Sequence, residues 1–205
     1  MQIIIDKKTG VLVTIIAVLL TTILGISLNK NSDGGFFGMH HNGNMGMGDN
    51  SGSTSYTGAD VMFLQMMIPH HQQAVDISDL ALTKSLDAEL LALAKKIRDE
   101  QAAEIITMKA WLKDADADLE MDHSMGHDMG GMLSDSDLAA LKSATGKNFD
   151  VLWLKGMTGH HDGALHMTMM IEDATNPEIK SFGQAIVSSQ SAQITQMAAM
   201  LKRMG

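Results

Sequence analysis

Apolar residues dominate one stretch near the N-terminus and recur only periodically after it. Residues 11–28 are apolar apart from three threonines, one glycine and one serine, and Lys7 and Lys8 precede them. A run of about 18 such residues lies at the border between a signal peptide and a membrane-spanning helix. Because no A-x-A cleavage motif follows, residues 1–30 are predicted to be an uncleaved signal anchor, a transmembrane helix with its N-terminus in the cytoplasm. A cleaved export signal is the alternative.

Between residues 57 and 204 the apolar residues recur with the 3.6-residue period of an α-helix. The spacing predicts helices from about residue 57, over 86–113, over 148–173 and over 177–203. A short helix is predicted from Ser134 to about Gly146, because Asp137 stands where a capping box places an acidic side chain.

The helical part of the chain contains an internal repeat. The string DVMFLQMMIPHH at 60–71 is matched by DVLWLKGMTGHH at 150–161. Further along, Ile97, Gln101 and Met108 are matched with the same spacing by Ile186, Gln190 and Met197. Two copies of one helical hairpin can bury their apolar stripes against each other as a four-helix bundle. The predicted fold class is therefore all-α, with one domain over residues 57–204.

Each repeat contains the string M-x-x-H-H. It gives six candidate metal ligands: Met67, His70, His71, Met157, His160 and His161. Residues three or four apart share a helix face, so each methionine can approach the same point as one of its histidines. Adjacent histidines diverge by about 100°, so the two rings of a pair cannot point the same way. Histidine pairs at symmetric places favour a functional site over core histidines that only pack.

The facing stripes of the partner helices contain polar residues where a bundle core normally has leucine. They are Gln101, Glu104, Gln190 and Gln193. A buried amide or carboxylate is costly unless it is hydrogen-bonded, so we predict that these side chains orient the imidazoles in one polar cluster. Met108 and Met197 follow one turn later, and core packing and ligation are both open for them. Met62 and Met66 are predicted to pack in the core.

The types of donor atom indicate which metal such a site would bind. The chain has 19 methionines and no cysteine, which excludes disulfides, thiolate metal sites and thiol nucleophiles. Thioether sulfur together with imidazole selects copper, especially Cu(I), over iron, manganese or magnesium, and silver is expected to be a mimic. The formal net charge of −9 and the absence of a basic stripe argue against nucleic acid as a partner.

Two glycine-rich segments carry further donors. Residues 31–56 have the composition of a flexible linker, and residues 114–133 form an acidic loop. Their soft donors are Met39, His40, His41, Met45 and Met47 in the linker and Met121, His123, Met125, His127, Met129 and Met132 in the loop. Methionines there gain nothing from packing and are prone to oxidation, so we interpret them as metal ligands. Low-complexity filler is the alternative.

Four strings of the helical part resemble a known family. They are M-x-P-H-H-x-x-A at 67–74, D-x-E-L at 87–90, I-x-x-x-Q-x-x-E-I-x-x-M-x-x-W-L at 97–112 and S-x-x-D-L-x-x-L-x-x-A-x-G-x-x-F-D at 134–150. Over about residues 57–204 the chain is similar to the family known as domain of unknown function 305 and to copper-binding CopM-type proteins. The resemblance implies a ferritin-like bundle, an extracytoplasmic bacterial location and ligands from the M-x-x-H-H strings. His166 stands where the first copy has Asp76, so His166 and the nearby Met170 are ligand candidates in the second half only.

These features predict an extracytoplasmic copper-binding protein, not an enzyme, that buffers, stores or transfers Cu(I) or Cu(II) and contributes to copper tolerance. The expected partners are the membrane, through residues 1–30, and a copper exporter or metallochaperone. A copper- or iron-dependent oxidase on the same bundle is the alternative, and it would need an open coordination position and a substrate pocket. A purely structural bundle that binds no copper is the third interpretation.

If residues 1–30 stay attached, the protein will be recovered in the membrane fraction, with Lys7 and Lys8 on the cytoplasmic side. Fractionation of bacterial cells that express the chain, followed by N-terminal sequencing, checks this expectation. A soluble form beginning near Asn29 would show instead that the signal is cleaved.

Overall fold

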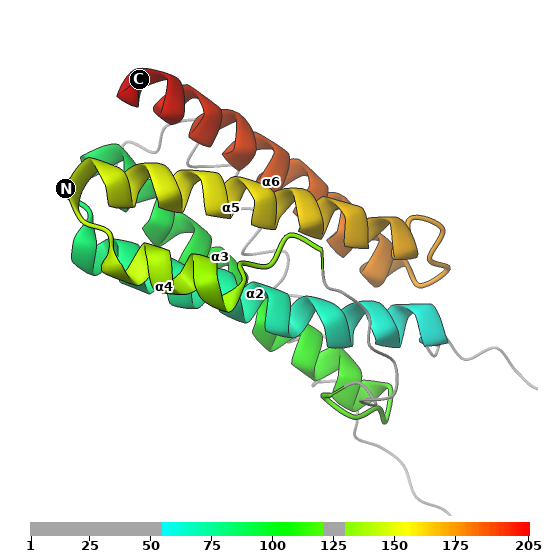
Figure 1. Ribbon diagram of the computed structural model, residues 1–205. Coiled ribbons are helices and arrows are strands. Elements are labelled where there is room, and N and C mark those ends of the chain that lie inside the picture. The colour runs from blue at the N-terminus through cyan, green and yellow to red at the C-terminus, as the bar shows by residue number, and fades with distance from the viewer. Residues whose placement is uncertain (1–54, 121–129) are drawn as a thin grey trace, which may run out of the picture. The chain divides into compact units, whose positions relative to one another are not determined.

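The computed structural model describes residues 55–120 and 130–205, and this part of the chain is an all-α bundle of five helices (Figure 1). The helices are α2 (Gly58–Lys84), α3 (Ala88–Asp114), α4 (Asp135–Ser143), α5 (Gly146–Thr168) and α6 (Pro177–Met204), with a 3-10 turn, η1 (Met169–Ile171), after α5. None of the described helices is long and apolar enough to cross a membrane.

Several predicted features lie outside the described residues. They are the signal anchor at 1–30, nearly all of the linker, and the donors Met39, His40, His41, Met45, Met47, Met121, His123, Met125, His127 and Met129. Met132 is described and half-buried.

Local capping explains where most helices begin. The Thr57 hydroxyl accepts from the backbone of Asp60, whose carboxylate accepts in return from Thr57, and Ser134 forms the predicted capping box with Asp137. The side chains of Asp87 and Asn176 accept from the first-turn amides of α3 and α6. The helix boundaries therefore follow signals that are visible in the sequence.

One boundary prediction was wrong, because α5 ends at Thr168 rather than near residue 173. The Thr168 hydroxyl donates to the carbonyl of Leu165 at 2.7 Å, three residues back, and the chain tightens there into η1. This early end places Met169 and Met170 on the 3-10 turn.

The four long helices pair in chain order, α2 with α3 and α5 with α6, as the repeat predicts, and the short α4 packs on α5 (Figure 1). The two hairpins meet along α2 and α5. Here Trp153 Nε1 donates to the Ile77 carbonyl at 3.0 Å, while His160 Nε2 lies 2.9 Å from the His70 carbonyl oxygen. The numbering rises on one helix as it falls on the other, so α2 and α5 run antiparallel.

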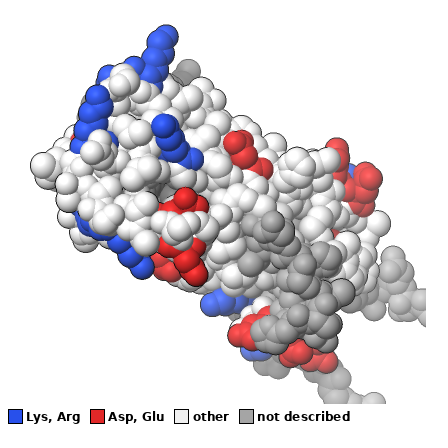
Figure 2. Space-filling model, viewed as in Figure 1, with Lys and Arg blue, Asp and Glu red and all other residues white. Residues whose placement is uncertain are grey.

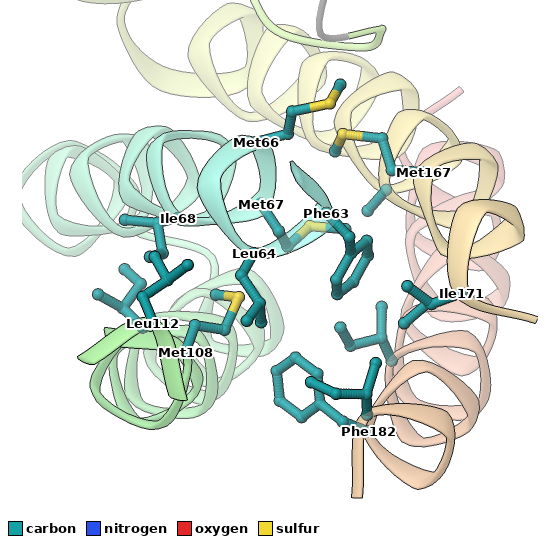
Figure 3. Packing of buried hydrophobic residues seen from close by; sticks show 14 residues of the cluster. Phe63, Leu64, Met66, Met67, Ile68, Met108, Leu112, Met167, Ile171 and Phe182 are labelled. Carbon is teal, nitrogen blue, oxygen red and sulfur yellow. The ribbon is translucent and has the colours of Figure 1, made fainter. Parts of the chain in front are cut away.

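The core consists of two apolar clusters with a polar layer between them. One contains Phe63, Leu64, Met67, Met108, Ile171 and Phe182 (Figure 3), and the other contains Leu90, Ile97, Trp153, Leu154, Met157 and Met197. On every long helix, polar residues stand between the two clusters: His70 and His71 on α2, Gln101 and Glu104 on α3, His160 and His161 on α5, Gln190 and Gln193 on α6. The predicted polar cluster is thus a layer across the bundle, to which all four helices contribute.

A close backbone contact fixes the chain beside this layer. Gly130 and Gly131 pack directly on α5, where a Cβ atom added to Gly163 would collide with the Gly130 carbonyl. Gly131 has φ +86°, a conformation that side chains disfavour. Leu133 is then held by Gln73, which accepts from its amide at 2.7 Å and donates to its carbonyl at 3.0 Å. The end of the loop is therefore attached to both α2 and α5.

Gly163→Ala should destabilise the chain by about 1–3 kcal/mol, because the new methyl group forces the backbone of Gly130 away from α5. Gly159→Ala is the matched control on the same helix, since a Cβ there meets no atom within 4 Å. It should be neutral or stabilising by up to about 1 kcal/mol through helix propensity. Urea unfolding followed by circular dichroism measures both, and equal effects would contradict the close packing.

Candidate metal centre

Four histidines form the middle of the polar layer. His70, His71, His160 and His161 are all 0% exposed. The rings of His70 and His160 stack across the α2–α5 contact, with centroids 3.7 Å apart and planes inclined by 36°. The structure therefore brings the two predicted histidine pairs, which lie 90 residues apart in the chain, into one site.

The hydrogen bonds of three rings fix which nitrogen carries the proton. His71 Nε2 lies 2.8 Å from the Glu104 carboxylate, and His160 Nε2 lies 2.9 Å from the His70 carbonyl. His161 Nε2 lies 2.6 Å from the Gln193 side-chain oxygen, since the Gln193 amide nitrogen donates to Glu100 at 2.8 Å. Each partner can only accept, so Nε2 is the donor and Nδ1 of the neutral ring keeps its lone pair.

These Nδ1 atoms have no hydrogen-bond partner in the part of the chain that the structure describes. Nδ1 of all four histidines, and also Nε2 of His70, are buried without a hydrogen bond among the described residues. A buried polar atom left unpaired costs about 1–3 kcal/mol. An imidazole with its Nε2–H bonded and its Nδ1 lone pair free is the form that binds a metal ion. The layer thus presents several oriented nitrogen donors inside the bundle.

Burial keeps three of these rings, His70, His160 and His161, neutral. Burial first, and then the neighbouring His71, lower the pKa of His70 to about 3. Burial lowers the pKa of His161 to about 4 despite its hydrogen bond to Gln193. The pKa of His160 lies well below its usual range, mainly because of burial and next because of His70. Protons therefore do not compete for these nitrogens near neutral pH.

Of the four residues predicted to orient the imidazoles, two are hydrogen-bonded to a histidine ring and two are not. Glu104 and Gln193 accept hydrogen bonds from the rings of His71 and His161. Gln101 and Gln190 are buried in the layer, but their amide groups have no hydrogen-bond partner among the described residues. Glu100, which fixes the orientation of the Gln193 amide, was missed because its sequence signal, a lysine four residues earlier, is typical of a solvated surface pair.

The bundle methionines flank the layer. Met67 and Met108 lie in one apolar cluster (Figure 3), and Met157 and Met197 lie in the other. All four are 0% exposed. The Thr158 hydroxyl lies 3.7 Å from the Met197 sulfur, which places that thioether near the helix of the second histidine pair.

Two further candidates lie away from the histidine layer. His166 is exposed and Met170 is half-buried, at the end of α5 and on η1. The described residues contain no group of three or more His, Asp or Glu side chains placed to hold one ion. The donors that the structure does gather are imidazole pairs with thioethers nearby, which are soft ligands.

The fold and the site define a class of protein: a small all-α bundle crossed by a buried layer of paired histidines. The chain belongs to the family described as a domain of unknown function (DUF305), whose model matches residues 60–201. No curated protein matches the chain.

Solved structures support this assignment. A protein of the family from Streptomyces coelicolor, whose name describes it as secreted, is 33% identical, with a TM-score of 0.68 over 72% of this chain and 92% of that one. A family fragment from Deinococcus radiodurans is 31% identical, with a TM-score of 0.67 over 73% and 99%. CopM in its Cu(I)-bound form is 31% identical, with a TM-score of 0.60 over 73% and 98%. CopM structures with Cu(II) and with silver are similar to this chain as well.

The neutral histidines should make stability depend on pH. The unfolded chain binds a proton on each imidazole below pH about 6.5, whereas the folded chain does so only near the lowered pKa values of about 3 for His70 and about 4 for His161. Their contribution to stability is therefore complete above pH about 6.5. It falls on acidification, by up to about 1.4 kcal/mol per pH unit for each ring.

Urea unfolding between pH 7 and pH 4.5, with a chelator present, measures this dependence. His161→Gln should flatten the pH dependence of the free energy of unfolding. Gln72→Ala replaces an exposed residue that does not titrate, and it should leave the pH dependence of the free energy of unfolding parallel to that of the unsubstituted chain. A His161→Gln profile parallel to both would contradict the proposed neutral state.

Proposed function

We propose that this chain is an extracytoplasmic copper-binding protein that holds Cu(I) in the buried histidine layer, and that it is not an enzyme. The observation that carries the proposal is a set of buried Nδ1 atoms that have no hydrogen-bond partner within residues 55–120 and 130–205. They belong to rings whose Nε2 protons are bound by Glu104, Gln193 and the His70 carbonyl. Four lone pairs buried together would destabilise the bundle unless they serve a ligand.

The spacing of the rings supports coordination by consecutive histidines. The ring centroids are 6.4 Å apart for His70 and His71 and 6.3 Å apart for His160 and His161. Two imidazoles that bind one ion from opposite sides, each through a bond of about 2.0 Å, have ring centres roughly 6 Å apart. Two ligands of this kind suit Cu(I), which accepts low coordination numbers and soft neighbours.

The surrounding atoms favour copper over harder metals. Met67, Met108, Met157 and Met197 place thioethers in the apolar clusters on either side of the layer. Dry, soft surroundings stabilise Cu(I) and silver, whereas Mg²⁺ and Mn²⁺ require oxygen ligands. CopM, whose structure is similar to that of this chain, has been solved with Cu(I), with Cu(II) and with silver. This supports the same ions for this chain.

The proposed cellular role is buffering, storage or transfer of copper outside the cytoplasm, in support of copper tolerance. A signal anchor at 1–30 would hold the bundle at the cell membrane, and the secreted relative supports export. The methionine- and histidine-rich segments would collect copper for the bundle. A copper exporter or metallochaperone is the proposed partner.

Replacing His70 and His160 with alanine together should remove the tightest Cu(I) site and leave the helix content unchanged. Competition titration against a Cu(I) chelator measures the affinity, and circular dichroism checks the fold. Gln72→Ala, at the exposed position after the first pair, is the control and should bind as the unsubstituted chain does. Unchanged affinity in the folded double variant would remove the site from the histidine layer.

Glu104→Gln tests the role of the hydrogen bond in a milder way. The amide can still accept from His71, but it no longer carries the charge that makes the ring a stronger donor to the metal. Loss of such an orienting partner typically weakens metal binding about 10- to 100-fold. The same titration should show this loss for Glu104→Gln, while the affinity of the Gln72→Ala control stays unchanged.

A further inference from the structure

A pocket of about 470 Å³ opens beside the histidine layer, where α5 passes into η1. It is lined by glycine backbone, at Gly130, Gly131, Gly159 and Gly163, and by Asp162, His166, Met167 and Met170. Each of these side chains carries a metal-donor atom: a carboxylate, an imidazole and two thioethers. None of these four side chains belongs to the proposed copper site in the buried histidine layer.

The pocket brings together donors from α5 and η1. Asp162 and His166 are four residues apart on α5 and share a face, Met167 follows His166, and Met170 lies on the 3-10 turn η1. His166 is exposed, Met170 is half-buried and Met167 is only 6% exposed. The donors therefore extend from the surface into the bundle.

The internal repeat shows that packing does not require these residue types. In the first copy the positions of His166, Met167 and Met170 are taken by Asp76, Ile77 and Leu80. Isoleucine and leucine fill the same helix face there without sulfur or imidazole. Soft donors thus occupy these three positions in the second copy only, which packing alone leaves unexplained.

The pocket adjoins the buried layer. Gly130, which lines it, lies beside the His70 ring, and Gly159 directly precedes His160. Met167 also faces α2, where its thioether end and that of Met66 point toward one another (Figure 3). Met66 is 6% exposed and stands one helical turn before His70.

Charge also favours a cation here. On the face seen in Figure 2, lysine and arginine gather mainly toward the end of the bundle where α6 finishes. Acidic side chains lie in several places on this face, and one group of them is at the other end, where α5 passes through η1 toward α6 and the pocket opens. A negative potential around a partly enclosed pocket raises the local concentration of cations.

We propose that this pocket is a second soft-metal site, in which His166, Met167 and Met170 bind one Cu(I) or silver ion at the surface of the bundle. The site rests on the proposed function for the choice of metal only, since its donors are separate from the four buried histidines. Asp162 adds negative charge at its mouth.

Silver is the probe for the test, because Ag(I) has the ligand preferences of Cu(I) and does not change oxidation state in air. The full chain is labelled at the methionine methyl groups with ¹³C, and the signals of Met167, Met169 and Met170 are assigned through single leucine variants. Adding Ag(I) should shift the signals of Met167 and Met170 and leave that of Met169, which is 63% exposed and outside the pocket, in place.

His166→Ala should abolish those two shifts while circular dichroism remains unchanged, because the exposed ring contributes little to packing. Persistence of both shifts in His166→Ala, or unmoved Met167 and Met170 signals in the unsubstituted chain, would overturn the site. Met169→Leu is the control and should leave the shifts of Met167 and Met170 as they are.

The outcome can be separated from that of the buried site. His166→Ala with Met170→Leu should lower the amount of silver bound at saturation by one ion per chain and leave the tightest Cu(I) affinity unchanged. Loss of that affinity in this variant would mean that the two sites are one, and the proposal would fail. Unchanged affinity after replacement of His70 and His160 would remove the buried site and leave the pocket test intact.

Discussion

The centre of the bundle depends on keeping imidazoles neutral in a place that water does not reach. Burial itself lowers the pKa values of His70, His160 and His161. Three of the four rings then donate Nε2–H to an acceptor on another helix: the His70 carbonyl on α2, Glu104 on α3 and Gln193 on α6. Because the acceptors belong to different helices, each hydrogen bond also fixes how two helices sit together. Such a network is strong when complete and costly when any member is lost.

The stability that the two apolar clusters contribute offsets the cost of burying this polar layer. Phe63 and Leu64 on one side and Trp153 and Leu154 on the other are fully buried, and they stabilise the helices that carry the histidines. Unpaired Nδ1 atoms reduce this stability, and an ion bound to them would restore it, since any ligand that binds only the folded chain stabilises it. Binding of copper and stability of the fold are therefore linked in the proposed function.

Local signals in the sequence accounted for the helices and for the composition of the layer. The caps at Thr57 and Ser134, the 3.6-residue period and the repeated M-x-x-H-H string lie within short windows, and the helix positions followed from them. Contacts between the hairpins could not be predicted in the same way. The stacking of His70 on His160 and the approach of Gly130 to Gly163 join residues far apart in the chain, and periodicity sets only the face of a residue, not its partner. Met66, which was predicted to be core packing, indeed lies in the core, but only the structure shows that it faces Met167.

The repeated hairpin has a consequence for how the layer assembles. The contact between His70 and His160 resembles the interface of a symmetric dimer, yet both halves belong to one polypeptide. A dimer formed from two separate hairpins would dissociate on dilution, whereas tethered halves meet at a high effective concentration whatever the amount of protein. Because both hairpins lie in one chain, their sequences can differ, since a substitution in one copy is not imposed on the other. The two copies do differ at matched positions, where Asp76 in the first corresponds to His166 in the second. The identical subunits of a homodimer cannot differ in this way.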